Sequence, residues 1–82
     1  MEIEPKIRTY IAENLLFSDD GFPFSDEASF LQEGIVDSIG IMELVNYVES
    51  TFGITIEDHE IVPDNLDSVA QLSNFVRSKK SN

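Results

Sequence analysis

The sequence predicts an all-α protein, a small antiparallel bundle of three main helices and one short helical turn, with a long loop between the first two helices. Apolar residues recur at helical spacing in three separate segments, and glycine, proline and acidic residues interrupt that spacing between them. At 82 residues, with 41% hydrophobic and 26% charged residues, the composition is that of one globular domain spanning residues 1–82.

The first helix is expected at residues 4–17. Its apolar side chains recur every four residues, at Ile3, Ile7, Ile11 and Leu15. Pro5 is compatible with this helix, because a residue in the first turn does not need a backbone N–H for an intrahelical bond.

Residues 18–37 are expected to form a loop, because they contain Gly21, Pro23 and Gly34 and show no helical or strand periodicity. A loop of this length is unusual in a small domain, so apolar side chains must hold it against the helices. The candidates are Phe22, Phe24, Phe30 and Leu31, and the aromatic side chains among them are expected to be half-buried.

The second helix is expected at residues 38–52 and has the most regular apolar pattern in the chain. Its apolar positions are Ile41, Leu44, Val45, Val48 and Phe52. Gly53 follows directly, where a helix commonly ends.

Residues 54–67 contain Pro63 and several acids, so at most one short helical turn is expected there. The last helix is expected at residues 68–78, where Ser68 and Gln71 have the spacing of a capping box. Its apolar positions are Val69, Leu72, Phe75 and Val76, and its basic end is formed by Arg77, Lys79 and Lys80.

The charge of the chain limits its partners. Sixteen acidic and five basic side chains give a net charge of -11, which repels nucleic acids and anionic lipid surfaces and favours basic protein partners. This charge also disfavours self-association, so a monomer is expected. The chain has no cysteine, no apolar run of membrane-spanning length and no signal-peptide pattern at its start, from which we expect a cytoplasmic protein.

The segment Gly-Ile-Val-Asp-Ser-Ile-Gly at residues 34–40 lies between the long loop and the second helix. Its Asp-Ser pair occurs again at residues 67–68, where the capping box explains the serine. Ser38 has no such reciprocal partner, although it could cap a backbone N–H alone. A serine at a helix start is also well placed to carry a phosphate group, because the free N–H groups and the helix dipole favour an anion there.

One face of the second helix has the character of a protein-docking surface. Ile39 lies roughly 160° from the apolar stripe, so it is expected to point outward. Met42, Glu43 and Glu49 lie beside the stripe or on the far side, where they mix apolar contacts with acids. Alternatively, the preceding loop covers Ile39 and the acids only solvate the helix. Gly40 within this first turn indicates either close approach of another segment or tolerance near a frayed end.

The motif at residues 34–40, followed by Ile-Met-Glu-Leu-Val at 41–45 and Phe-Gly-Ile at 52–54, resembles the phosphopantetheine-binding carrier proteins, an acyl carrier protein-like family. The resemblance covers nearly the whole chain. It is closest in motif to stand-alone aminoacyl or D-alanyl carrier proteins, because fatty-acid carriers usually have an acid at the position of Gly40.

The resemblance implies that Ser38 receives 4'-phosphopantetheine from coenzyme A through a magnesium-dependent phosphopantetheinyl transferase. The thiol of this arm would hold acyl or aminoacyl groups as thioesters, which an acyl or aminoacyl ligase (adenylating enzyme) loads and a downstream transferase or synthase consumes. Asp37 would help to present Ser38. The resemblance further implies that partner enzymes recognise the residues at four positions of the second helix: Ile39, Met42, Glu43 and Glu49.

The alternative is an unmodified acidic helical adaptor that binds a basic protein, with Ser38 acting only as a helix cap. Catalysis by the chain itself is not expected, because no base accompanies a serine and the one histidine, His59, lies in an acidic turn. A metal site is not expected either. Placing Gly21 at its required position in a calcium loop would put Leu16 where a carboxylate is needed.

Overall fold

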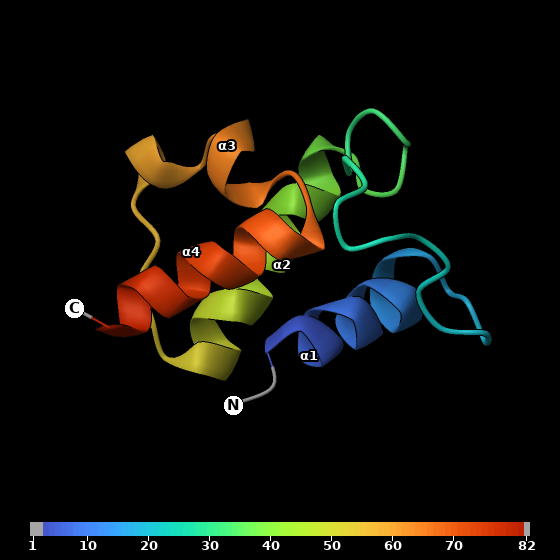
Figure 1. Ribbon diagram of the computed structural model, residues 1–82, viewed down its shortest axis with the longest axis horizontal. Coiled ribbons are helices and arrows are strands. Elements are labelled where there is room, and N and C mark those ends of the chain that lie inside the picture. Colours follow the sequence, from blue (N-terminus) through green and yellow to red (C-terminus); the bar gives the residue numbers. More distant parts are fainter. Residues whose placement is uncertain (1–2, 82) are drawn as a thin grey trace.

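The computed structural model describes residues 3–81 and confirms the predicted fold class. A first helix α1 (Ile3–Tyr10) continues as a π-helical turn η1 (Ile11–Leu15), and the long loop then leads to α2 (Ser38–Phe52). A 3-10 turn η2 (Asp58–Glu60) and a short helix α3 (Pro63–Leu66) precede the last helix α4 (Val69–Ser81). No strand occurs among the described residues, and α1 and α4 run in opposite directions (Figure 1).

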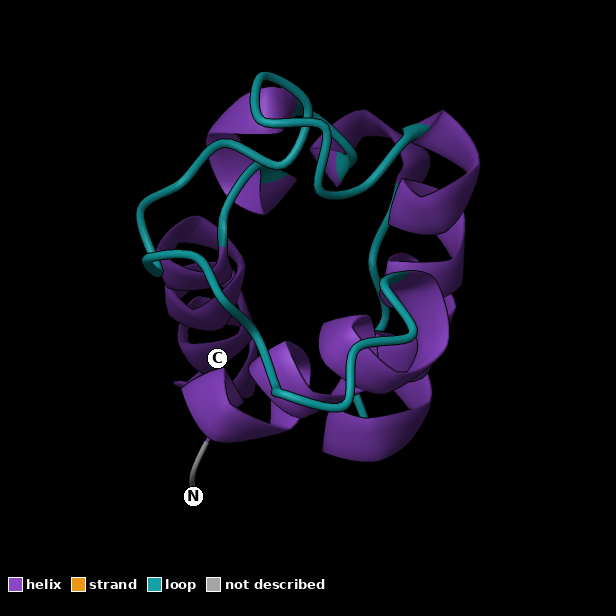
Figure 2. Ribbon diagram, turned by 90° about the vertical axis from the view of Figure 1, so that its right-hand side faces the viewer, coloured by secondary structure: helices purple, strands orange, loops and turns teal. Residues whose placement is uncertain are grey.

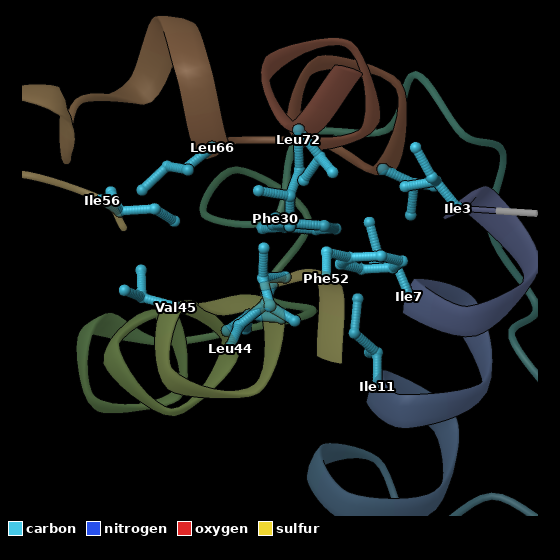
Figure 3. Packing of buried hydrophobic residues seen from close by; sticks show 14 of the residues in the cluster. Ile3, Ile7, Ile11, Phe30, Leu44, Val45, Phe52, Ile56, Leu66 and Leu72 are labelled. Atoms are coloured by element: carbon cyan, nitrogen blue, oxygen red, sulfur yellow. The ribbon is translucent and has the colours of Figure 1, made fainter. Parts of the chain in front are cut away.

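The helices enclose one apolar core, and the long loop crosses the end of the bundle that faces the viewer in Figure 2. The helices contribute most of the buried cluster (Figure 3). The buried side chains are Ile3, Ile7, Ile11, Phe30, Ile35, Val36, Leu44, Val45, Val48, Phe52, Ile56, Leu66, Val69, Leu72 and Val76. All of the second helix's expected apolar positions are buried except Ile41, which is partly buried against the same cluster.

The predicted helix boundaries differ from the structure mainly at the ends. The second helix is confirmed at its predicted bounds, and Gly53 ends it with a left-handed backbone at φ 68°. The first helix ends at Leu15 instead of residue 17, because Leu16 N–H donates to the Ile11 carbonyl in a π-type turn and Phe17 leaves the helical conformation. The last helix extends to residue 81, where the Lys80 ammonium donates to the Phe52 carbonyl at 2.9 Å.

Residues 54–67 hold two short turns, η2 and α3, where the sequence predicts at most one. Pro63 was expected to interrupt helical structure, but it occupies the first turn of α3, where its fixed φ and missing N–H are tolerated. The prediction was wrong on this segment because proline can begin a helix as well as end one.

The loop aromatics are not uniformly half-buried as predicted. Phe22 is half-buried, but Phe30 is completely buried and Phe24 keeps 37% of its surface exposed. The aliphatic Leu31 is 49% exposed. Phe30 is therefore the one aromatic side chain of the loop that is fully buried, and it anchors the loop together with Ile35 and Val36, which are buried at the loop's end.

Hydrogen bonds that Asp67 accepts fix the loop next to Phe30. Phe30 N–H donates to the Asp67 carbonyl oxygen at 2.7 Å, and the Asp67 carboxylate accepts from Leu31 N–H at 3.1 Å and from the Ser29 hydroxyl. These bonds span 36 to 38 residues of sequence. They satisfy loop backbone groups that would otherwise need water, which explains how a long loop without regular structure is accommodated.

A second group of hydrogen bonds holds an earlier part of the loop, at Asp26. The Arg8 guanidinium donates to both carboxylate oxygens of Asp26, at 2.9 and 2.8 Å, and the Asp26 carbonyl accepts from Ala70 N–H at 2.9 Å. The loop is thereby connected to both α1 and α4.

Two glutamates form ion pairs with α4. Arg77 donates to Glu4 at 2.6 Å, and this hydrogen bond is the main cause that lowers the pKa of Glu4. The pKa of Glu60 is also lowered, first by the Glu57 backbone N–H and then by the Lys79 ammonium, each 2.9 Å from the carboxylate. Since both folded-state pKa values lie below the ordinary value of 4.5, the ionised carboxylates stabilise the fold above that pH.

We expect Glu60→Gln to lower the urea midpoint of unfolding at pH 7, and we expect this difference from wild type to shrink as the pH falls below 4.5 through the folded-state pKa. Glu33→Gln removes the same charge from an exposed site whose side chain makes no hydrogen bond within the described chain. Urea titrations of the three proteins across this pH range provide the measurement. An equal effect of the two substitutions at pH 7 would contradict the role of the Glu60 contacts.

None of the helices within residues 3–81 combines the length and the apolar character needed to cross a membrane.

Candidate functional site

Ser38 is the first residue of α2, and its side chain is exposed. Its hydroxyl makes no hydrogen bond to any described residue, so the possibility that Ser38 caps the helix is wrong. The cap is Asp37, whose Oδ1 accepts from Gly40 N–H at 2.7 Å while its backbone carbonyl accepts from Ile41 N–H at 2.9 Å. Asp37 therefore fixes the start of the helix and leaves the Ser38 oxygen available for chemistry.

The second Asp-Ser pair has a different structure. Ser68 is only 4% exposed, and its hydroxyl oxygen accepts from Gln71 N–H at 3.1 Å. The Ser68 hydroxyl in turn donates to the Gln71 side-chain oxygen at 3.3 Å. The serine half of the predicted capping box is confirmed, but the Gln71 side chain bonds the Ser68 hydroxyl instead of its backbone N–H. The burial of Ser68 leaves Ser38 as the accessible serine of the two pairs.

Gly40 is buried because the end of the long loop passes close to it. A Cβ atom at this position would lie 2.7 Å from Val36 Cγ1 and 3.2 Å from Asp37 Oδ1. Of the two interpretations that the sequence leaves open, close approach is therefore correct. The absence of a side chain at Gly40 allows Val36 to pack into the core and Asp37 to reach its capping position.

The first two turns of α2 present a mixed apolar and acidic face. Ile39 is 73% exposed and Met42 is 48% exposed, so the alternative in which the loop covers Ile39 is wrong. Glu43 is exposed on the same helix. With Asp37 and Ser38, these residues lie together at the start of α2, where the sequence predicts the site.

Glu49 does not join this group. It lies eleven positions after Ser38, about 16 Å along a helix at 1.5 Å per residue. It is half-buried, and its Oε2 accepts from Ile56 N–H at 2.8 Å. This hydrogen bond holds the segment that leaves α2, so one of its two carboxylate oxygens serves the fold.

A groove of about 340 Å³ adjoins Ser38 between α2 and α3. Its walls are mainly apolar and include Met42 from α2, Leu31 from the loop and Val62 and Leu66 near α3. The loop and α3 residues of this groove are absent from the site predicted from sequence. The pair Ile61-Val62 directly before Pro63 is the signal that could have found it, because apolar residues at an otherwise acidic turn need a packing partner.

The geometry fits attachment of a phosphate-linked group to Ser38. The hydroxyl is exposed and unbonded, it lies at the positive end of a helix of fifteen residues, and an apolar groove lies beside it. No group of three His, Cys, Asp or Glu side chains among the described residues could hold a metal ion.

Comparisons with known proteins agree with this geometry. The family model described as "Phosphopantetheine attachment site" matches residues 5–76. The chain is 32% identical over 79 residues to an acyl carrier protein of Bdellovibrio bacteriovorus, covering 96% of each chain. It is also 32% identical over 78 residues to an acyl carrier protein of Thermosynechococcus vestitus, covering 95% of this chain and 91% of the relative.

Proposed function

We propose that Ser38 carries the prosthetic arm of this protein, because the chain belongs to the phosphopantetheine attachment site family. Membership makes the protein a phosphopantetheine-dependent carrier of the acyl carrier protein type, a class that is not catalytic by itself. The single observation that carries the assignment to Ser38 is its exposed and unbonded hydroxyl at the start of α2. Ser68, the other serine preceded by aspartate, is buried and bonded.

The residues around Ser38 suit the two ends of the arm. The α2 N-terminus favours the phosphate, since its N–H groups and dipole stabilise a negative charge. The apolar groove beside Ser38 can shelter the arm or an apolar cargo from water. When bound, 4'-phosphopantetheine supplies a terminal thiol for thioester chemistry, a group that the cysteine-free chain lacks.

The face at the start of α2 would receive successive partner enzymes. Ile39 and Met42 offer exposed apolar contacts, and Glu43 and Asp37 offer charges that attract basic surfaces. We assign Glu49 to long-range attraction, since one of its oxygens is already bonded to Ile56 N–H. The partners are a phosphopantetheinyl transferase, an acyl or aminoacyl ligase, and a downstream transferase or synthase.

We further propose that the protein is an aminoacyl or D-alanyl carrier, because it has glycine at position 40. Gly40 has no room for the acid that fatty-acid carriers usually have there. Loading the arm-bearing protein with a panel of acyl and aminoacyl substrates and a cognate ligase, followed by intact mass, would identify the cargo. A cytoplasmic location stays a prediction from the sequence.

The attachment is tested by incubating the apo protein with coenzyme A, magnesium and a broad-specificity phosphopantetheinyl transferase. We expect the intact mass of wild type to rise by one phosphopantetheine group and that of Ser38→Ala to stay unchanged. Ser50→Ala, which removes another exposed hydroxyl from α2, should be modified as wild type. An unmodified wild type would favour the acidic adaptor instead, and modification of Ser38→Ala would place the arm elsewhere.

A further inference from the structure

The residue that ends the first helical segment is unusual for its backbone conformation. Phe17 has a φ of 53°, the only positive φ at a non-glycine position among the described residues. Hydrogen bonds hold both of its neighbours: Leu16 N–H donates to the Ile11 carbonyl at 2.9 Å, and Ser18 N–H donates to the Ala12 carbonyl at 2.8 Å. The conformation is thus fixed on both sides.

Helices commonly end on a left-handed residue, and glycine is preferred there because a side chain is strained in this conformation. The chain follows that preference at the end of α2, where Gly53 has a φ of 68°. Phe17 occupies the same kind of position without the preferred residue. A bulky residue with a positive φ is a genuine outlier, and such strain tends to occur at functional sites.

Packing does not account for Phe17 either. Its side chain is 81% exposed, more than any other large hydrophobic residue in the described chain. A single exposed apolar residue needs no explanation by itself. Here, however, a glycine at position 17 would relieve the backbone strain and also remove the exposed ring. Backbone conformation and solvent exposure therefore both disfavour phenylalanine at this position.

The surroundings of Phe17 are acidic. The ring adjoins a surface hollow of about 360 Å³ whose other lining residues are Glu13, Ser18 and Asp19. Both acids are exposed, and no basic side chain lines the hollow. The complementary surface is therefore an apolar socket edged by lysine or arginine side chains.

Phe17 and Ser38 belong to the same end of the bundle. A Cβ atom on Gly40, two residues after Ser38, would lie 3.8 Å from Cδ1 of Leu15, two residues before Phe17. The loop that starts at Phe17 crosses this end (Figure 2). A standard protein interface takes about 20 to 30 residues from each partner, so the footprint of an enzyme seated over Ser38 is large enough to include the neighbouring end of η1.

We propose that Phe17 is a docking anchor for the phosphopantetheinyl transferase, whose surface would offer the ring an apolar socket with a basic rim. The inference rests on the proposed attachment of the arm to Ser38. Among the partner enzymes, the transferase alone meets the chain before the arm exists, so its affinity for the carrier comes from the protein surface alone. The backbone that presents the ring is already fixed by the hydrogen bonds of Leu16 and Ser18, so little backbone entropy is lost on binding.

The test measures steady-state transfer from coenzyme A to the apo protein by a broad-specificity transferase. For Phe17→Ala and Phe17→Gly we expect KM for the carrier to rise about tenfold with kcat unchanged, as for the loss of an interface anchor. Phe17→Leu should retain part of the affinity. Phe17→Gly should unfold at a urea concentration equal to or above that of wild type, which separates docking from folding.

Matched variants test the specificity of the effect. Phe24→Ala removes another exposed phenylalanine of the same loop, and its KM should stay within about twofold of wild type. Asp19→Asn should raise KM at low salt more than Asp58→Asn, which removes the same charge from an exposed site in η2.

A KM within twofold of wild type for both Phe17→Ala and Phe17→Gly would overturn the anchor, as would an equal increase for Phe24→Ala. Equal effects of Asp19→Asn and Asp58→Asn on KM would contradict the inference that the transferase socket has a basic rim. Failure of the proposed attachment at Ser38 gives a different result, because wild type itself would then gain no mass.

Discussion

Phe30→Ala is expected to lower the free energy of unfolding by about 3 to 5 kcal/mol, the usual cost of deleting a buried phenylalanine ring. Phe30 has no exposed surface and lies in the middle of the apolar cluster (Figure 3). A small domain has roughly 5 to 15 kcal/mol of total stability, so this one change would remove a large part of it. Urea titration followed by far-ultraviolet circular dichroism measures the loss.

Two variants serve as controls for Phe30→Ala. Phe30→Leu keeps most of the buried volume and should cost less than about 1.5 kcal/mol. Phe24→Ala acts on a loop phenylalanine that is 37% exposed and should cost clearly less than Phe30→Ala. A loss below about 1 kcal/mol for Phe30→Ala would show that the loop is not anchored by this ring.

Asp67→Ala is expected to cost about 2 to 3 kcal/mol, because it leaves Leu31 N–H and the Ser29 hydroxyl without their charged acceptor. The Phe30 N–H bond uses the Asp67 backbone carbonyl, so it can persist in the variant. The loop should therefore loosen around residue 31 before the bundle unfolds. Amide hydrogen exchange should show faster exchange at Leu31, and urea titration should give the loss of stability.

Asp67→Asn keeps one acceptor oxygen and should lose less stability than Asp67→Ala. Asp64→Ala removes a nearby exposed carboxylate that makes no side-chain hydrogen bond within the described chain, and it should change stability by less than about 0.5 kcal/mol. If Asp67→Ala behaved like Asp64→Ala, the loop would be held without this carboxylate.

Helical periodicity predicted the parts of the fold that depend on local sequence. The bounds of α2 follow from its apolar stripe and Gly53, and the cap at Ser68 follows from its spacing to Gln71. The contacts of Asp67 join residues 36 to 38 positions apart, and no local pattern records them. For the same reason the sequence did not distinguish Phe30 from the other loop aromatics.

The sequence predicted where along the chain the candidate site lies, but it did not predict which residue caps α2 or which residues form the groove beside Ser38. The pattern around Ile39 correctly indicated an exposed face, since helical geometry alone decides the direction of a side chain. It did not predict that Asp37 makes the cap, because Asp37 and Ser38 are both good capping residues and only the backbone geometry selects between them. The groove beside Ser38 also escaped prediction, since the loop and α3 meet there only in the folded chain.

The close approach at Gly40 restricts how this protein can change. Any residue with a Cβ there would collide with Val36, a stiff β-branched side chain that is itself buried. A carboxylate at this position would therefore require a smaller residue at 36 as well, and each change made first would pass through a poorly packed intermediate. Re-engineering this carrier toward enzymes that need an acid at this turn is thus a two-residue problem, and designed libraries should vary the pair together.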